Sequence, residues 1–241
     1  MAILVTGATG TLGREVVPVL RARDAEVAVL SRKRHPEFRT ADLDSGAGLR
    51  EALDGIDTVV HLAAGSDQAR ETHTLISAMR GAGVDRIVFV SIVGIDDIPF
   101  PYYRAKLAAE RAVFASGFGV SVLRATQFHS FAAAPFLAQR RWPVMFAPRL
   151  NVQPIDVRVV AAELADLALD DPRGRVDDIG GPQLLSGREI AAAVEARFGL
   201  HRRIVEFGLP GRTWNGFADG YHLAPQNTAG GRTFAEYLDA L

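Results

Sequence analysis

Cysteine is absent from the 241 residues of this chain. Disulfides, cysteine nucleophiles and thiolate metal ligands are therefore excluded. Long hydrophobic runs are also missing, since no stretch approaches the roughly 18 consecutive apolar residues that a membrane-spanning helix requires. The opening MAILVTGATG enters a strand pattern without the basic and apolar regions of a signal peptide. We therefore expect a cytoplasmic protein that makes no membrane contact.

An excess of charge of one sign is missing as well. Lys and Arg number 27 against 28 for Asp and Glu, which gives a formal net charge of -1. Basic residues cluster only briefly, at 32–34 and 140–141. Binding to nucleic acid usually needs a broad basic surface, so we expect a small-molecule substrate instead. The sequence leaves open whether the protein is a monomer or a homodimer.

Short apolar runs alternate with helical patterns across the first half of the chain. The predicted strands cover residues 2–6, 26–31, 38–41, 58–62, 86–91 and 120–124. Helical spacing of apolar residues begins near Thr11, Leu49, Asp67 and Tyr102. Apolar strands separated by helices are typical of a parallel sheet covered on both faces. The sequence therefore predicts an α/β fold with a doubly wound parallel sheet.

The second half of the chain is less regular. Asp156 is predicted to cap a helix that ends before Pro172. Ser186 and Glu189 have the spacing of a capping box, and Gly199 is placed to end that helix. Because no linker divides the chain, we expect residues 126–241 to form a small substrate-binding lobe packed on the core, to which the helix at 155–170 returns.

Three glycines follow the first predicted strand. Gly7, Gly10 and Gly13 lie in VTGATGTLG, between that strand and the first helix. Glycine permits a tight turn, close approach of the backbone to phosphates, and packing of helix on strand. Since the second strand is also correctly placed, the pattern favours a dinucleotide site over an ordinary glycine-rich turn. Residues 1–125 are thus predicted to form a Rossmann-like NAD(P)-binding core.

The end of the second predicted strand bears on the choice between NADP(H) and NAD(H). Ser31 and Arg32 stand there, where an acidic residue would favour NAD(H). A hydroxyl and a guanidinium suit a 2′-phosphate, because arginine can donate two hydrogen bonds to it. We therefore expect NADP(H), and the alternative is a solvated basic turn.

Several short motifs carry a resemblance to a known family. The segments TGATGTLG, ADLD, HLAAG, VSIVGID and YYRAK resemble the short-chain dehydrogenase/reductase superfamily, and above all its atypical, NmrA-like NAD(P)-binding branch. The similarity covers essentially the whole chain, including NVQPIDVRVVAAELADLAL and GGRTFAEYL.

The resemblance implies a set of cofactor and catalytic residues. The cofactor contacts that it implies, together with those from the glycine loop and the second strand, are Gly7, Thr9, Gly10, Thr11, Leu12, Gly13, Ser31, Arg32, Asp42, Leu43, Leu62, Ala63, Ala64 and Lys106. Ser91, Tyr102 and Lys106 match the family's catalytic serine, tyrosine and lysine. In that arrangement tyrosine exchanges a proton with the substrate oxygen, lysine favours the phenolate and holds the nicotinamide ribose, and serine steadies the oxygen.

The spacing of these residues can be weighed on its own. Tyr102 and Lys106 are four residues apart and share a helix face, whereas Tyr103 lies three residues from Lys106 and outside the family register. Ser91 ends a predicted strand at the edge where such sheets bind ligands. Tyr102 is therefore the expected acid and Tyr103 a flanking pocket or packing residue. The asparagine of many classical members has no equivalent in 67–82, where Thr72, His73 and Thr74 stand.

Aromatic and polar residues after the last core strand suggest the substrate side. Gln127 and Phe128 are expected near the nicotinamide, and His129, Phe131 and Trp142 in the substrate pocket. For His129 we consider a second acid/base role, but the sequence favours a hydrogen-bonded structural histidine. No histidine has metal-ligand spacing, so we expect no metal.

Together these features predict an NADPH-dependent oxidoreductase that reduces a small carbonyl, enone or quinone-like compound. The alternative is an NmrA-like redox sensor that binds NADP without turnover. A third possibility is an epimerase or dehydratase.

Overall fold

The computed structural model describes residues 1–65 and 67–241. Contacts divide the chain into two compact units. The N-terminal unit comprises Met1–Ser91, Arg104–Arg124 and Val160–Asp177, and the C-terminal unit comprises Ile92–Tyr103, Ala125–Val159 and Asp178–Leu241. No helix among these residues is long and apolar enough to span a membrane.

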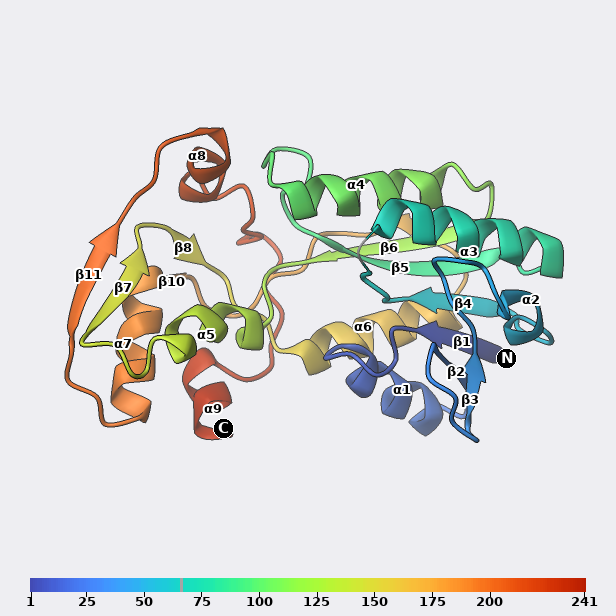
Figure 1. The fold of residues 1–241 in the computed structure, drawn as a ribbon, viewed down its shortest axis with the longest axis horizontal. Helices are drawn as coiled ribbons and strands as arrows, with labels where there is room; N and C mark the ends of the chain where they lie inside the picture. Colours follow the sequence, from blue (N-terminus) through green and yellow to red (C-terminus); the bar gives the residue numbers. More distant parts are fainter. Residues whose placement is uncertain (66) are drawn as a thin grey trace. The chain divides into compact units, whose positions relative to one another are not determined.

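A seven-stranded sheet forms the centre of the N-terminal unit (Figure 1). Its order is β3-β2-β1-β4-β5-β6-β9. The strands are β1 (Ala2–Thr6), β2 (Glu26–Ser31), β3 (Phe38–Thr40), β4 (Thr58–His61), β5 (Arg86–Ile92), β6 (Gly119–Ala125) and β9 (Gly174–Arg175). The order reverses between β1 and β4, which pair in parallel, and ligands bind beyond the carboxyl ends of strands at such a switch point. The predicted α/β fold with a doubly wound parallel sheet is confirmed.

Helices cover both faces of this sheet. They are α1 (Gly13–Ala22), α2 (Leu49–Ala52), α3 (Gln68–Ala82), α4 (Pro101–Phe114) and α6 (Val157–Leu169). In Figure 1, α3 and α4 lie over one face, and α1 and α6 over the other. The six strands predicted from the sequence are β1 to β6, with ends that agree within one residue.

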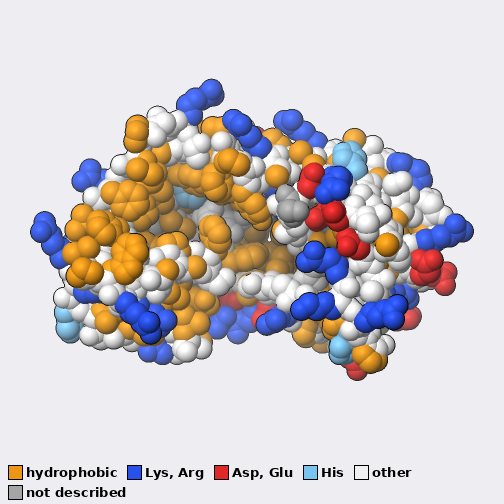
Figure 2. Space-filling model, viewed as in Figure 1, with side chains coloured by type: hydrophobic (Ala, Val, Ile, Leu, Met, Phe, Trp, Pro, Cys, Tyr) orange, Lys and Arg blue, Asp and Glu red, His pale blue; other side chains and the backbone are white. Residues whose placement is uncertain are grey.

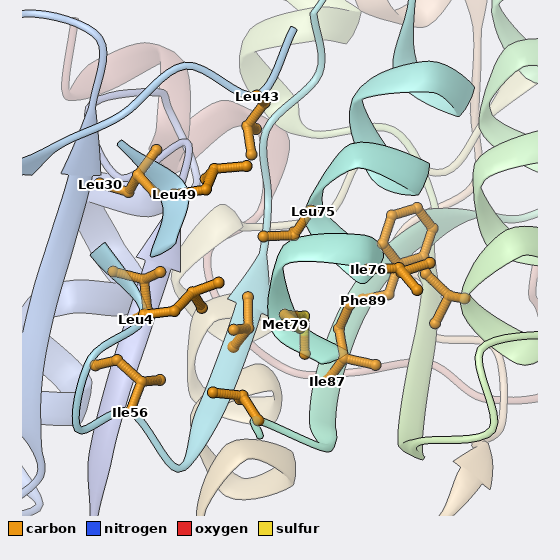
Figure 3. Packing of buried hydrophobic residues seen from close by; sticks show 14 of the residues in the cluster. Leu4, Leu30, Leu43, Leu49, Ile56, Leu75, Ile76, Met79, Ile87 and Phe89 are labelled. Carbon is orange, nitrogen blue, oxygen red and sulfur yellow. The ribbon is translucent and has the colours of Figure 1, made fainter. Parts of the chain in front are cut away.

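Apolar side chains from the sheet and helices interlock in the N-terminal unit (Figure 3). Leu4 and Ile87 come from strands, and Leu75 and Met79 from one face of α3. All four side chains are at most 1% exposed. Burial of this kind is worth about 25 cal/mol for each Å² of apolar surface, and it makes the sheet a rigid support for the loops at its edge.

The C-terminal unit has a separate core. Its strands are β7 (Val144–Pro148), β8 (Asn151–Val152), β10 (Leu185–Ser186) and β11 (Arg203–Phe207), and its helices are α5 (His129–Ala138), α7 (Gly187–Arg197), α8 (Arg212–Ala218) and α9 (Phe234–Asp239). β11 pairs with β7 in parallel, and β10 with β8 antiparallel. Phe136 of α5, Met145 of β7 and Phe234 of α9 are buried together.

The predicted helix ends in this half are also present. Ser186 caps α7, with Glu189 completing the capping box, and Gly199 follows the helix at a φ of 62°. The side chain of Asp156 accepts a hydrogen bond from the Arg158 amide at 3.0 Å at the start of α6. These local signals were strong enough to locate both helices from the sequence.

Candidate active site

The glycine loop begins directly after β1. Gly7 has a φ of 67°, and a Cβ there would lie 2.7 Å from the amide nitrogen of Ala63. A Cβ on Gly13 would lie 2.4 Å from the Cα of Ala8. Gly10 is exposed, and the nearest atom to a Cβ there is the Gly7 carbonyl oxygen, at 3.2 Å. Gly7 and Gly13 are therefore required by the fold, whereas Gly10 leaves the outer surface of the loop without a side chain.

This loop leads to the amino end of α1. No side chain caps that end of the helix. The amides of Arg14 and Glu15 donate to the carbonyls of Gly10 and Leu12, at 3.1 and 3.0 Å, and the dipole of the helix favours an anion at this end. Thr9 and Thr11 are exposed beside this end, whereas Leu12 is buried. The arrangement suits a pyrophosphate group.

The end of β2 supplies basic and hydroxyl groups. Arg32 is exposed, and Ser31 Oγ accepts a hydrogen bond from the Lys33 amide at 3.1 Å. Beyond β3, Asp42 Oδ1 accepts a hydrogen bond from the Asp44 amide at 2.7 Å, and Leu43 is buried. The hydroxyl of Ser31 and the guanidinium of Arg32 could contact a phosphate.

Residues 62–64 follow β4 next to the glycine loop. The amides of Leu62 and Ala63 both donate to Thr6 Oγ1, at 3.2 Å each. Ala64 is exposed. The Glu71 carboxylate accepts a hydrogen bond from the Gly65 amide at 3.2 Å, and burial raises the pKa of that carboxyl. Side chains of β1 and α3 thus fix both ends of this segment.

Two polar side chains are buried at the end of β5 and on α4. Ser91 is 3% exposed, and its hydroxyl oxygen has no hydrogen-bond partner among the residues described. Lys106 is 4% exposed, with its ammonium 4.4 Å from the centre of the Phe89 ring. Burial lowers the pKa of Lys106 to about 8, and the Glu110 carboxylate partly opposes that shift. Glu110 is itself held by Arg124, whose guanidinium donates to it at 2.6 and 3.1 Å.

The two tyrosines of α4 differ sharply in exposure. Tyr102 is 44% exposed and Tyr103 only 6%. The ring of Tyr103 packs edge-on against Phe100 and Phe217, with centroids 5.7 Å apart in both pairs. Burial raises the pKa of Tyr103 to about 12, and the neighbouring Gln127 side chain opposes that rise. Tyr103 is thus a packed phenol, and Tyr102 remains accessible to a ligand.

The residues after β6 lie at the start of α5. Gln127 Nε2 donates to the His222 carbonyl at 3.4 Å, and Phe128 precedes the helix. His129 is 3% exposed and stacks on Tyr237 at 5.2 Å, and within the described chain neither ring nitrogen has a hydrogen-bond partner. Burial lowers the pKa of His129 to about 4. Among the described residues this ring therefore lacks the hydrogen bonds expected of a structural histidine.

Exposed apolar side chains are concentrated in the C-terminal unit. Phe131 is 69% exposed and Trp142 is 52% exposed. Figure 2 shows apolar side chains gathered over this unit, while charged side chains are frequent over the N-terminal unit. The described residues contain no group of three or more His, Asp or Glu side chains that could hold a metal ion.

Sequence reasoning missed one buried polar group at this edge of the sheet. His61, the last residue of β4, is 1% exposed and hydrogen-bonded to Thr6 and Thr72. Its position at the end of a buried strand, directly before the segment at 62–64, was the available signal.

The residues present fit a nicotinamide dinucleotide. The uncapped amino end of α1 and the bare surface at Gly10 suit its pyrophosphate, and Arg32 suits a phosphate on its ribose. The Ser91 hydroxyl is buried at the end of β5 without a hydrogen-bond partner among the described residues.

Comparison with known proteins agrees with this fit. A family model described as NAD(P)H-binding matches residues 7–138. The NAD(P)H azoreductase of Xenophilus azovorans is 30% identical over 278 residues, covering 99% of this chain and 97% of that protein. The (4-alkanoyl-5-oxo-2,5-dihydrofuran-3-yl)methyl phosphate reductase of Streptomyces griseus is 31% identical, covering 86% of this chain and 77% of that protein.

A solved structure has the same fold. The NADPH-dependent quinone oxidoreductase of Escherichia coli, in complex with NADPH, superposes with a TM-score of 0.84 at 19% identity and covers 99% of each chain. The family match spans the glycine loop, strands β2 to β6 and α4. The chain belongs to the NAD(P)H-binding family that this model describes, and it is related to NAD(P)H-dependent and other reductases.

Proposed function

We propose that this protein is an NADPH-dependent oxidoreductase that reduces a small, conjugated carbonyl, enone or quinone-like compound by hydride transfer. The observation that carries the proposal is the buried Ser91 hydroxyl, which has no partner among the described residues. An unsatisfied buried hydroxyl costs about 1–3 kcal/mol, and such groups are found where a ligand completes the hydrogen bonding. Lys106 adds a second buried polar group on the neighbouring helix.

Each side chain has a definite task in this reaction. Bound NADPH supplies the hydride, which carries two electrons to the substrate carbon. Tyr102 donates the proton that the substrate oxygen needs, and the Ser91 hydroxyl donates a hydrogen bond to that oxygen. Lys106, four residues after Tyr102 on α4, holds the nicotinamide ribose and stabilises the phenolate that Tyr102 becomes. The products are an alcohol or hydroquinone and NADP⁺.

The surface of the C-terminal unit and the names of two relatives support a flat, apolar acceptor. Phe131 and Trp142 offer exposed aromatic rings, and aromatic rings bind planar conjugated molecules by stacking. One relative is named an azoreductase, and the name of the other describes a dihydrofuran ring whose double bond is conjugated with carbonyl groups. Conjugated acceptors of both kinds take up a hydride readily because the charge spreads over several atoms.

The exposed guanidinium of Arg32 supports NADPH as the preferred reductant. Arg32 directly follows Ser31, the last residue of β2. In this class of fold the adenosine ribose of a dinucleotide lies at that position. A 2′-phosphate there would gain charge-assisted hydrogen bonds that the hydroxyl of NADH cannot make.

The proposal is tested by following NADPH oxidation with a panel of quinones, enones, azo compounds and aromatic aldehydes. Wild type is expected to turn over at least one class. Tyr102→Phe is expected to lower kcat by about 100-fold or more, the usual contribution of a positioned acid, with NADPH affinity unchanged.

Tyr103→Phe is the matched control, because it removes the same hydroxyl from the adjacent, packed ring. Its kcat is expected to stay within about threefold of wild type, since its phenol is far from ionising. NADPH binding without oxidation by any acceptor would favour the redox sensor. Conversion of a substrate without net loss of NADPH would favour an epimerase.

A further inference from the structure

His61 joins three elements at the carboxyl edge of the sheet. It is the last residue of β4, and its Nδ1 lies 2.8 Å from Thr6 Oγ1 of β1. Its Nε2 lies 3.1 Å from Thr72 Oγ1 of α3. All three side chains are at most 1% exposed. Water therefore does not compete for these hydrogen bonds.

The bonds of Thr6 determine which ring nitrogen carries the proton. Thr6 Oγ1 already accepts hydrogen bonds from the amides of Leu62 and Ala63. A hydroxyl has two acceptor sites and one proton, so the remaining bond must be a donation from Thr6 to His61. Nδ1 of His61 is consequently the acceptor and has no proton.

The other side of the ring gives the same answer independently. Thr72 Oγ1 donates its proton to the Gln68 carbonyl, at 2.7 Å. It must therefore accept the hydrogen bond from His61, and Nε2 carries the proton. Both threonines thus define one neutral tautomer, and a second proton on the ring would disrupt the bond to Thr6.

The surroundings also oppose a charge on this ring. Burial, together with the charge of Lys106 on α4, lowers the pKa of His61 to about 3. The charge that acts on His61 is that of Lys106. The ring of Phe89 on β5 lies beside the His61 ring, with the two ring centroids 5.6 Å apart. Of the neighbouring pair His61 and Lys106, Lys106 therefore carries the positive charge.

The network ends on the segment that borders the glycine loop. Thr6 fixes the amides of Leu62 and Ala63, and a Cβ on Gly7 would lie 2.7 Å from the Ala63 nitrogen. A small shift of this segment would therefore change the shape of the loop around Gly7.

We infer that His61 is a positioning residue, held as the neutral Nε2–H tautomer, that sets the backbone of residues 62–63 against the glycine loop and so tunes the affinity for the dinucleotide. The inference rests on dinucleotide binding by this loop and not on the acceptor or the catalytic tyrosine of the proposed function.

The tautomer is tested first, by nitrogen NMR of the full chain labelled with ¹⁵N-histidine. The His61 signals are identified as those that disappear in His61→Gln. We expect an unprotonated Nδ1 and a protonated Nε2 that persist down to about pH 5, where an ordinary histidine is charged. A proton on Nδ1, or a charged ring at that pH, would overturn the inference.

The effect on binding is tested by comparing Thr72→Val with Thr74→Val. Thr74 is the matched control, because its hydroxyl makes the same kind of bond to the helix backbone, at 3.0 Å to Arg70, without meeting His61. Thr72→Val leaves Nε2–H unpaired and is expected to weaken NADPH binding about tenfold, whereas Thr74→Val should change it less than twofold.

A split between kinetic constants separates positioning from chemistry. In Thr72→Val we expect KM for NADPH to rise while kcat at saturating NADPH stays within about twofold. Equal NADPH affinity in the two threonine variants would overturn the inference, even if both fold. Because binding is measured without an acceptor, failure to find any turnover would contradict the proposed function and leave this result standing.

Discussion

Arg32 is the residue that we propose to select NADPH over NADH. It is exposed at the end of β2, beside Ser31. We predict that Arg32→Ser weakens NADPH binding by about tenfold to 100-fold, because hydrogen bonds to charged groups contribute roughly 1.5–3 kcal/mol. NADH binding should change little, since NADH has no 2′-phosphate. Titration of each cofactor by fluorescence measures both values.

The neighbouring Lys33 offers the control for this prediction. It is also exposed and basic, and its amide bonds to Ser31 Oγ. Lys33→Ser removes the same charge one residue away, so a general electrostatic effect would weaken NADPH binding equally in both variants. Equal losses would contradict a specific role for Arg32.

At the scale of single residues, the sequence predicted which polar residues belong to the candidate site. It did not predict the hydrogen-bond partners of these residues. Ser91 and Lys106 were identified by their match to the family's catalytic positions, Ser91 at the end of a strand and Lys106 on a helix. The bonds of His61 were not predicted, because they join β4 to β1, 55 residues away, and to α3, 11 residues away. Such pairs depend on how strands and helices are placed in space, and no local pattern reports that.

Glycines give the clearest test at the scale of an element. A Cβ on Gly13 would overlap the Cα of Ala8, so we predict that Gly13→Ala destabilises the fold by about 1–3 kcal/mol and weakens NADPH binding. Gly81 lies inside α3 with no atom within 4 Å of a Cβ. Gly81→Ala should stabilise the protein by up to about 1 kcal/mol, because alanine favours the helix.

Chemical denaturation of both variants measures the two effects. The two changes in unfolding free energy have opposite signs because the space around the added Cβ differs, although the substitution is the same. A Gly13→Ala protein as stable as wild type would mean that α1 can move away from the loop, and the tight packing inferred here would be wrong.

Helices and strands were predicted well where local signals were strong. The capping box of Ser186 and Glu189 and the apolar strands of the sheet are examples. The pairing of β11 with β7 was not predicted, because β11 is short, partly exposed and follows an irregular loop. Its position depends on a strand 59 residues earlier in the chain, because Arg203 of β11 pairs with Val144 of β7.

At the scale of the whole molecule, buried histidines make stability depend on pH. The pKa of His61 is lowered from 6.5 to about 3, so below pH 6.5 the unfolded chain takes up a proton that the folded chain does not. The unfolding free energy should therefore fall as the pH falls through this range, by about 2 kcal/mol for His61 between pH 7 and pH 5. His129, with its pKa lowered to about 4, acts in the same direction.

Denaturation curves at several pH values test this dependence. His61→Gln cannot take up the proton and should flatten the slope between pH 7 and pH 5, whatever its stability at neutral pH. His73→Gln is the control, because His73 is exposed on α3. An unchanged slope in His61→Gln would contradict the assignment of a neutral, buried His61.

The central claim for the molecule as a whole is that it transfers hydride from NADPH to a conjugated acceptor. The most direct measurement uses NADPH that carries deuterium at C4, on the face from which the hydride is transferred. An acceptor that the enzyme reduces is converted in ordinary water, and the mass of the product is measured. We predict that one deuterium appears on carbon in the product of an enone or carbonyl acceptor, while the accompanying proton comes from water through Tyr102. With an enone or carbonyl acceptor, whose product keeps the deuterium on carbon, a product without deuterium from either face of the nicotinamide would contradict hydride transfer.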